Sequence, residues 1–165
     1  MILIINICKE PLHELEFVKP IEDILKTNGF SYKTKHYKKI GQKDISNANK
    51  IIICGTSLKD NEFLKNTKEF SWIKNYEKPL LGICGGAHII GLTLGYKLKK
   101  GEEIGLKPFE IKKEFLGIKP GRKINVYHLH QFKVLPEVFK KDNLYATLFH
   151  PEVRNKNIIV EFCRL

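Results

Sequence analysis

Short apolar runs recur along the first half of the chain. Unbroken runs at 2–8, 51–54 and 80–83 are typical of parallel strands that are buried on both faces. Residues 31–37 alternate between apolar and polar side chains and predict a further strand. The run at 51–54 is broken by Gly55-Thr56-Ser57, which indicates a turn at its end. We therefore expect four strands before residue 84.

The segments between these runs carry helical patterns. One pattern extends from Pro11 to Asn28, and Pro20 within it suits the first turn of a helix that begins near Lys19 and ends at the Asn-Gly pair that follows. Further helices are predicted for 61–76 and 86–95. Strands and helices in alternation predict a parallel sheet with right-handed crossovers.

The second half of the chain has a different pattern. Residues 97–134 are rich in Gly and Pro and contain short β-like pieces at 110–115 and 124–128, which predict an antiparallel extension. Residues 144–149 alternate and predict one more strand of the main sheet. The tail at 157–162 has the β-propensity of a strand.

Length and composition favour an ordinary globular protein. A chain of 165 residues with 42% hydrophobic content is expected to form one domain, 1–165, with a substantial core. No apolar run reaches transmembrane length, and the first residues lack the charged lead of a signal peptide. The four cysteines form no Cys-x-x-Cys pair, so we expect reduced thiols and a cytoplasmic location.

The net charge of +11 raises the question of an acidic partner. The lysines are scattered along the chain, and the densest group, 33–39, falls in a predicted strand and loop. This distribution favours a solvated basic surface over a nucleic-acid site. We expect no nucleic acid and no membrane among the partners.

The strongest chemical signal is the segment Pro79-Leu80-Leu81-Gly82-Ile83-Cys84-Gly85-Gly86-Ala87-His88. An apolar strand stops at a cysteine between glycines, and a helix follows at once. In the related Gly-x-Ser-x-Gly elbow, the nucleophile sits on a strained turn of this kind. The N–H groups at the start of the helix favour a thiolate, which is the reactive form of cysteine. Free cysteines are often plain buried side chains, but the glycine bracket favours a nucleophile at Cys84.

A nucleophilic thiol needs a base, and the base needs an orienting group. The segment Phe149-His150-Pro151-Glu152-Val153 supplies both, because an alternating strand delivers His150 at its end and Glu152 follows two residues later. A His-Pro-Glu tripeptide alone is more often a loop. Together with the cysteine elbow it predicts a Cys84, His150, Glu152 triad.

These two motifs together resemble the class I (triad) glutamine amidotransferases, and the resemblance runs from about Ile51 to the C-terminus. It implies an α/β fold with three layers, in which a mostly parallel central sheet with a flavodoxin-like core carries a small antiparallel extension. It also implies that the thiolate of Cys84 attacks the side-chain amide of glutamine and forms a thioester. His150 would act as acid and base and Glu152 would orient it, with no metal and no organic cofactor. After His-Pro-Glu the family usually closes with a helix, so the tail is expected to be helical despite its β-propensity.

The oxyanion formed in this attack needs N–H donors, typically one from the residue after the nucleophile, here Gly85. In the family a second donor comes from a Gly-rich loop after the neighbouring strand, which corresponds to Gly55-Thr56. Family members usually have two glycines there, so Thr56 departs from the pattern. An ordinary turn that ends the strand is the alternative interpretation of this loop.

Four polar residues are candidates for holding glutamine, all by the family resemblance: His88, His128, His130 and Gln131. His88 stands where many members have Gln, and it could equally be a hydrogen-bonded core residue. The other three lie in a stretch that resembles the family's Ser-His strand before Leu-Pro. His128 and His130 share one strand face, but no third ligand is evident, so no metal site is predicted.

The ammonia produced must be consumed elsewhere, because the chain has no phosphate-binding Gly-x-x-x-x-Gly-Lys loop and no room for a synthetase domain. The resemblance implies a separate ammonia-accepting synthetase subunit. Two alternatives remain open at this stage. The chain could be a stand-alone hydrolase of γ-glutamyl amides, or a non-catalytic relative that binds a partner.

Overall fold

A six-stranded sheet runs through the computed structural model, which describes all residues 1–165. Its strand order is β2-β1-β3-β4-β8-β7. Neighbours from β2 to β8 pair in parallel, and β7 pairs antiparallel with β8 at the edge. The strands are β1 (Ile2–Asn6), β2 (Tyr32–His36), β3 (Lys50–Ile53), β4 (Leu80–Ile83), β7 (Val138–Lys141) and β8 (Leu144–Thr147).

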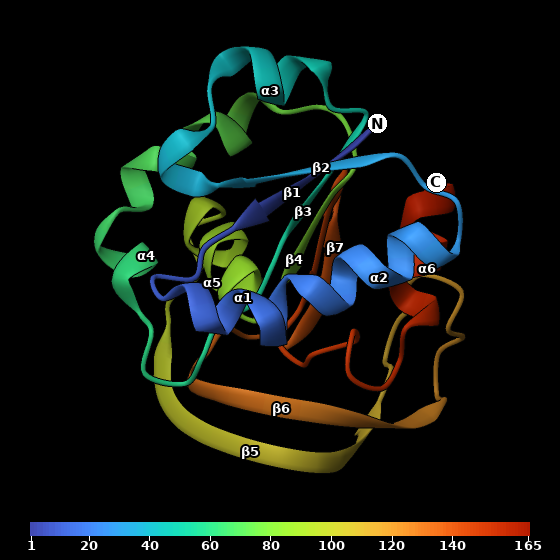
Figure 1. Cartoon of the computed structure of the whole chain (residues 1–165). Helices are drawn as coiled ribbons and strands as arrows, with labels where there is room; N and C mark the ends of the chain where they lie inside the picture. Colours follow the sequence, from blue (N-terminus) through green and yellow to red (C-terminus); the bar gives the residue numbers. More distant parts are fainter.

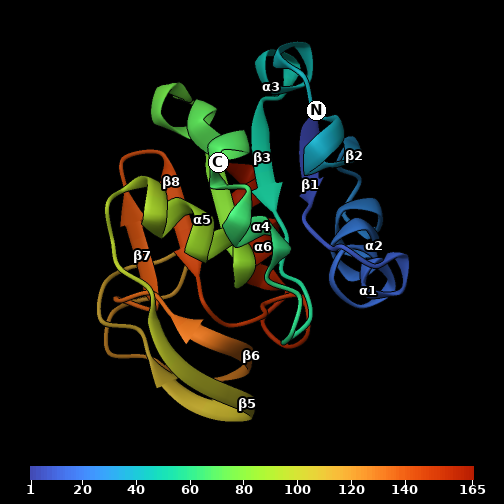
Figure 2. The same ribbon diagram turned by 90° about the vertical axis from the view of Figure 1, so that its left-hand side faces the viewer.

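Helices cover both faces of this sheet, as is usual for parallel sheets in α/β proteins. On one face α2 packs against α6, and on the other α5 packs against the 3₁₀-helix η2 (Figures 1 and 2). No helix is both long enough and apolar enough to span a membrane. The helices are α1 (Pro11–Phe17), α2 (Lys19–Thr27), η1 (Tyr37–Lys39), α3 (Gln42–Asn47), α4 (Glu62–Lys65), η2 (Thr67–Asn75), α5 (Gly85–Thr93) and α6 (Asn157–Arg164).

A two-stranded antiparallel hairpin forms a separate small sheet, which lies below the main sheet in Figure 1. Its strands are β5 (Lys99–Glu110) and β6 (Lys123–Lys133). The predicted antiparallel extension is therefore confirmed, but the strand predicted at 110–115 is wrong, because β5 ends at Glu110. The apolar side chains of Ile111 and Phe115 are buried beyond that end without forming a strand. The real strand is rich in charge because its outer face is exposed, which hides it from a search for apolar runs.

Two other predicted elements differ in form. The helix predicted for 61–76 is divided into α4 and η2 at Asn66, whose side-chain amide donates to the carbonyl of Glu62 and so ends the first turn. Asn commonly breaks helices through such local hydrogen bonds. The tail forms helix α6, as the family resemblance implied. Its β-branched residues favour a strand, but the helix buries one continuous stripe of side chains against the core, and that burial outweighs propensity: Ile158, Ile159, Phe162 and Cys163.

The remaining predictions of the parallel core are confirmed. The strands β1, β3 and β4 are buried at nearly every position, and α2 begins at Lys19 and ends before Gly29, which has a φ of 74°. Because β1, β3, β4 and β8 are parallel, their carboxyl ends meet at one edge of the sheet. Ligands of open α/β sheets bind at this edge. Cys84, Gly55 and His150 follow three of these strands.

Candidate active site

Cys84 occupies a sharp turn between β4 and α5. Its φ of 48° and ψ of −99° lie in a region that non-glycine residues rarely adopt. Two backbone hydrogen bonds hold it there: its N–H donates to the carbonyl of Thr147 at 2.8 Å, and its carbonyl accepts from the N–H of His88 at 3.0 Å. Strain of this kind persists only where the surroundings enforce it, and it concentrates at functional sites.

The glycines on either side of Cys84 permit this turn, because a side chain at Gly82 or Gly86 would collide with neighbouring backbone. A Cβ on Gly82 would lie 2.5 Å from the backbone of Gly86, and a Cβ on Gly86 would lie 2.4 Å from the carbonyl oxygen of Ile53. Helix α5 therefore begins in direct contact with the strands beneath it. Gly85 is the first residue of α5, where N–H groups have no partner within the helix.

His150 and Glu152 form a buried pair beyond the end of β8. The imidazole Nδ1–H donates to Glu152 Oε1 at 2.7 Å, and the side chains are fully buried. The backbone N–H of His150 donates to the carbonyl of Tyr127 in β6, which anchors the loop. The other ring nitrogen, Nε2, is buried and makes no hydrogen bond. The pair therefore leaves one nitrogen for chemistry.

The surroundings of His150 favour its protonated form. Burial alone lowers the pKa of this imidazole, but its interactions with Glu152 and with Cys84 outweigh burial, and the pKa is raised well above its usual value. The environment of His150 therefore favours the ring with both nitrogens protonated. A protonated imidazole beside a thiol is the arrangement that activates cysteine nucleophiles.

Gly55 brings the two halves of the site together. A Cβ on this residue would lie 2.6 Å from His150 Cε1 and 3.4 Å from Cys84 Cβ. The turn after β3 thus packs directly against both the thiol and the imidazole. The structure places Cys84, His150, Glu152 and the Gly55-Thr56 turn, which come from three separate parts of the sequence, around one point.

Thr56, which departs from the family pattern, is held by a residue that the sequence pattern did not indicate. Its hydroxyl donates to Asp60 Oδ2 at 2.7 Å, and the N–H of Lys9 donates to the same oxygen at 2.7 Å. Asp60 is buried and thereby ties the loop after β3 to the loop after β1. The available signal was a hydroxyl followed by a carboxylate four residues later, which is common in turns and carries little specificity.

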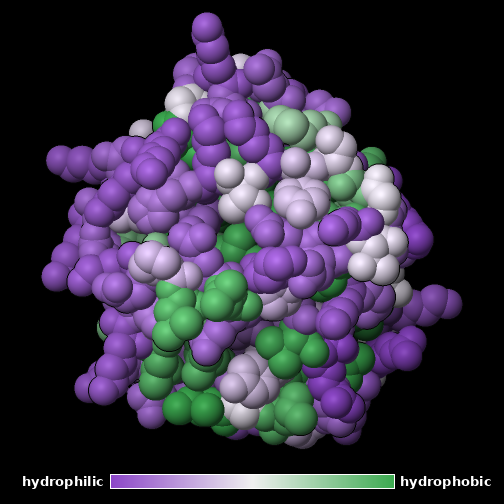
Figure 3. Space-filling view, in the orientation of Figure 1, coloured by the Kyte–Doolittle hydropathy of each residue, from purple (hydrophilic) through white to green (hydrophobic).

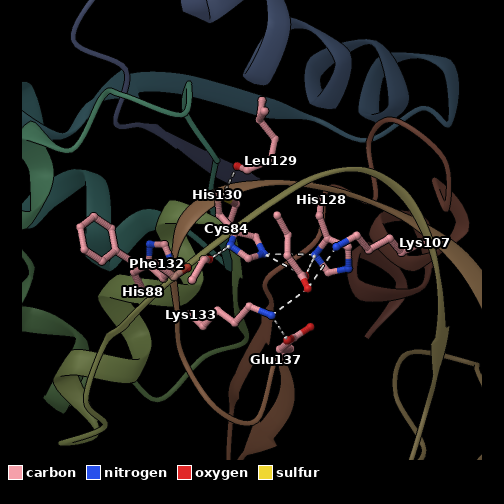
Figure 4. A network of polar contacts seen from close by, with 11 residues as sticks. Cys84, His88, Lys107, His128, Leu129, His130, Phe132, Lys133 and Glu137 are labelled. Atoms are coloured by element: carbon pink, nitrogen blue, oxygen red, sulfur yellow. Dashed lines mark hydrogen bonds and ion pairs between the residues drawn. The ribbon is translucent and has the colours of Figure 1, made fainter.

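The hairpin covers the thiol from the other side. Cys84 Sγ lies 3.4 Å from the carbonyl oxygen of Leu129 in β6, and Figure 4 shows this contact. Nearby, His88 Nε2 donates to the carbonyl of Phe132 at 2.9 Å. Burial lowers the pKa of His88 to about 4, so its ring is neutral. His88 thus binds the hairpin strand in this structure.

His128 and His130 lie beside one another on one face of β6. His130 Nδ1 lies 3.2 Å from the carbonyl of Gly101, and His130 Nε2 lies 3.2 Å from His128 Nδ1. The hairpin also brings Glu103 of β5 to this pair, a residue for which the sequence carries no clear signal. Gln131 lies apart from them, with its side-chain oxygen 3.4 Å from Asn61 Nδ2.

Two surface cavities of about 670 and 820 Å³ flank these elements. The smaller is lined by His13 of α1 and by the loop that carries Asp60, and the larger lies along the hairpin and includes His128 and Glu103. Neither is lined by Cys84, whose residue surface is 4% exposed. Cys84 is therefore closed off in this conformation, and Leu129 of β6 is in contact with its thiol.

The sequence matches the profile of one protein family, described as glutamine amidotransferase class-I, over residues 13–152. The chain belongs to the class I glutamine amidotransferases. The matched region begins in α1 and ends at Glu152, so it includes the cysteine elbow and the His-Glu pair.

Individual relatives of this chain are distant. One subunit of the glutamine-hydrolysing GMP synthase of Archaeoglobus fulgidus is 29% identical over 116 residues, which cover 56% of this chain. The match spans 62% of the length of that relative. A protein of Thermoplasma acidophilum, described as the corresponding GMP synthase subunit, superposes with a TM-score of 0.79 at 21% identity, covering 99% of this chain and 93% of the other. A glutamine amidotransferase from Thermotoga maritima gives 0.68 at 20% identity, covering 94% and 77%. These structures confirm the fold.

Proposed function

We propose that this chain hydrolyses the side-chain amide of glutamine through a Cys84 thioester and supplies the ammonia to a separate synthetase subunit. The observation that carries the proposal is the buried 2.7 Å pair of His150 and Glu152, with its free Nε2 beside a strained cysteine. Membership of the family makes glutamine the expected substrate. We further propose that residues 1–165 form a single domain, which works in the cytoplasm and needs no cofactor.

The first half of the reaction forms the thioester. The Cys84 thiolate adds to the carbonyl carbon of the glutamine side chain, and the carbonyl oxygen becomes an oxyanion. N–H groups at the start of α5, from Gly85, and of the Gly55-Thr56 turn are the proposed donors to this oxygen. The Nε2 proton of His150 then passes to the departing nitrogen, the C–N bond breaks, and ammonia leaves.

The second half regenerates the thiolate. His150, now neutral, takes a proton from water at Nε2, and the resulting hydroxide attacks the thioester carbonyl. The C–S bond breaks, so glutamate is released and Cys84 leaves as thiolate beside a protonated His150. Glu152 accepts the hydrogen bond from Nδ1 throughout and holds the ring in one tautomer.

The closed thiol gives a reason for a partner. Because Cys84 is almost fully buried and Leu129 of β6 contacts its thiol, we expect the hairpin to move when glutamine enters. Apolar side chains of α1 and β5 are exposed on this face, namely Leu12, Leu15, Ile104 and Leu106. Figure 3 shows apolar atoms gathered in its lower half, where Figure 1 shows α1 and the hairpin. A synthetase that docks there could open the site, and the description of the Archaeoglobus relative as one subunit of a synthase favours such a partner.

A turnover assay tests the proposal. Glutamate release from glutamine should depend on Cys84 and on His150, and it should rise when a candidate synthetase subunit is added. The matched comparison is Cys163→Ala, because Cys163 is as buried as Cys84 but lies in α6, away from the proposed machinery. Turnover of other γ-glutamyl amides but not of glutamine would indicate the stand-alone hydrolase. No turnover of any amide with any candidate synthetase would contradict the enzymatic proposal and favour a partner-binding protein.

A further inference from the structure

Three metal-ligating side chains converge in the hairpin, outside the Cys84 triad. His128 and His130 come from β6, and Glu103 comes from β5 across the register shift between Lys100 and Glu103. The two imidazoles are almost fully buried, and the carboxylate is 20% exposed. Figure 4 shows the two histidines side by side, with dashed contacts meeting between them and two lysines.

The spacing of the three donor atoms fits a metal ion. His128 Nδ1 lies 3.2 Å from His130 Nε2, and Glu103 Oε2 lies 3.6 Å from the first and 3.7 Å from the second. In a tetrahedral site, ligand atoms about 2.0 Å from one Zn²⁺ lie about 3.3 Å apart, which is close to these separations. The three donor atoms are therefore close enough together to share one ion.

The surrounding contacts prepare the donors for coordination. His130 Nδ1 donates to the carbonyl of Gly101, so its Nε2 presents a lone pair toward the centre of the cluster. Glu103 uses its other oxygen, Oε1, to accept from Lys133 at 2.8 Å and from Lys107 at 3.2 Å, which leaves Oε2 facing the histidines. Hydrogen bonds that orient the ligands from behind are typical of built metal sites.

We propose that Glu103, His128 and His130 form a binding site for a divalent transition-metal ion. Two imidazoles and one carboxylate select such ions over Mg²⁺ and Ca²⁺, which prefer oxygen ligands. Separations of 3.2–3.7 Å are close to those of tetrahedral ligands, with the fourth position left to water, so Zn²⁺ fits best. Glu103 and His128 also line the 820 Å³ cavity, which gives the ion a path from solvent.

Binding requires one rearrangement of protons. In the metal-free state His128 Nδ1 donates to His130 Nε2, and this proton must move to His128 Nε2 before Nδ1 can coordinate. The shift is between tautomers of one neutral ring, so no proton is lost. The bound ion would then link β5 to β6 through His128 and His130, the two neighbours of Leu129. The carbonyl of Leu129 contacts Cys84 Sγ. The site therefore holds the strand that covers the thiol, although Cys84 is not one of its ligands.

The experiment is metal titration in the Cys84→Ala background, since a free thiol beside His150 could itself bind Zn²⁺. We expect one Zn²⁺ per chain by equilibrium dialysis with elemental analysis, and tetrahedral d–d absorption when Co²⁺ is used instead. Thermal stability should rise with Zn²⁺ but not with Mg²⁺. Adding Glu103→Gln or His128→Gln to this background should weaken Zn²⁺ binding at least about tenfold.

The matched control is Glu102→Gln, which removes an exposed carboxylate next to Glu103 and should leave the affinity unchanged. Circular dichroism identifies any variant that fails to fold, and the other ligand variant then decides. No saturable Zn²⁺ binding in the Cys84→Ala protein would overturn the proposal. Equal binding with and without Glu103 and His128 would overturn it as well. None of these readouts depends on glutaminase activity, so this proposal and the proposed function can fail separately.

Discussion

The parallel core and the β5–β6 hairpin meet at Cys84, but they hold their residues in place by different means. In the core, close contacts with neighbouring backbone at Gly82 and Gly86, and with the His150 ring at Gly55, leave no room for a single extra carbon. In the hairpin, residues are held in place by the ion pairs of Glu103 and by hydrogen bonds to β6 carbonyls. The core is therefore suited to a fixed catalytic geometry, whereas the hairpin is suited to moving as one unit over the thiol.

The largest expected effect lies in the core, at Glu152. Glu152→Gln keeps the size of the side chain but removes the charge that raises the pKa of His150. We expect glutaminase activity with the synthetase to fall by about 10²- to 10⁴-fold, as for orienting residues of other triads. Because the reaction needs protonated His150 to release ammonia, activity is lost as pH rises through this pKa. The alkaline limb of the pH–rate profile should therefore move to lower pH, and an unmoved limb would argue against the role of Glu152.

Gly55 tests whether the core geometry is as intolerant as its contacts suggest. The Cβ of Gly55→Ala would meet the His150 ring, so we expect a loss of about 2 kcal/mol in the free energy of unfolding together with at least about a tenfold loss of activity. Denaturant unfolding and the glutaminase assay measure the two effects. Gly41→Ala is the control, because the nearest atom to its Cβ is Asp44 Oδ2 at 3.9 Å. Full activity in Gly55→Ala would show that the turn after β3 can move.

His88 links the two regions, because it sits on α5 and binds the carbonyl of Phe132 in the hairpin. The pKa of His88 is about 4 in the folded protein, whereas a histidine in the unfolded chain has a pKa of about 6.5. Between these two values the unfolded chain binds a proton at His88 and the folded chain does not. The contribution of neutral His88 to the free energy of unfolding is therefore fully present above pH 6.5, and it is lost as the pH falls toward 4. We expect about 2 kcal/mol less stability at pH 5 than at pH 7 from His88. His88→Gln should remove that share of the pH dependence in denaturant unfolding, and an unchanged dependence would contradict it.

The smallest effects are expected on the outer face of the hairpin. Ile104→Ser and Leu106→Ser change side chains that are 53% and 57% exposed, so the free energy of unfolding should change by less than about 0.5 kcal/mol. Activity of the isolated chain should not change. If the synthetase docks on this face, the two substitutions should reduce only the stimulation by the partner. A large loss of stability would mean that the hairpin is as tightly built as the core.

The same contrast explains what the sequence could predict. Buried parallel strands are continuous apolar runs, so β1, β3 and β4 could be located closely, and the elbow at Cys84 followed from its glycines. The exposed strand β5 has no such signal, because many of its side chains face solvent. Contacts across the hairpin depend on register, and the shift at Glu103 cannot be predicted from local pattern. The sequence therefore could not predict that Glu103 joins the two histidines, or that the Leu129 carbonyl contacts the Cys84 thiol.

The most direct test of the central claim is covalent labelling by a glutamine-analogue electrophile, followed by intact mass measurement and peptide mapping. The claim is that Cys84 is a nucleophile activated by His150 and Glu152. It predicts one adduct per chain on Cys84, faster in the presence of the synthetase subunit, and none in Cys84→Ala. A wild-type chain that stays unlabelled with the synthetase present, or an adduct that persists in Cys84→Ala, would contradict it.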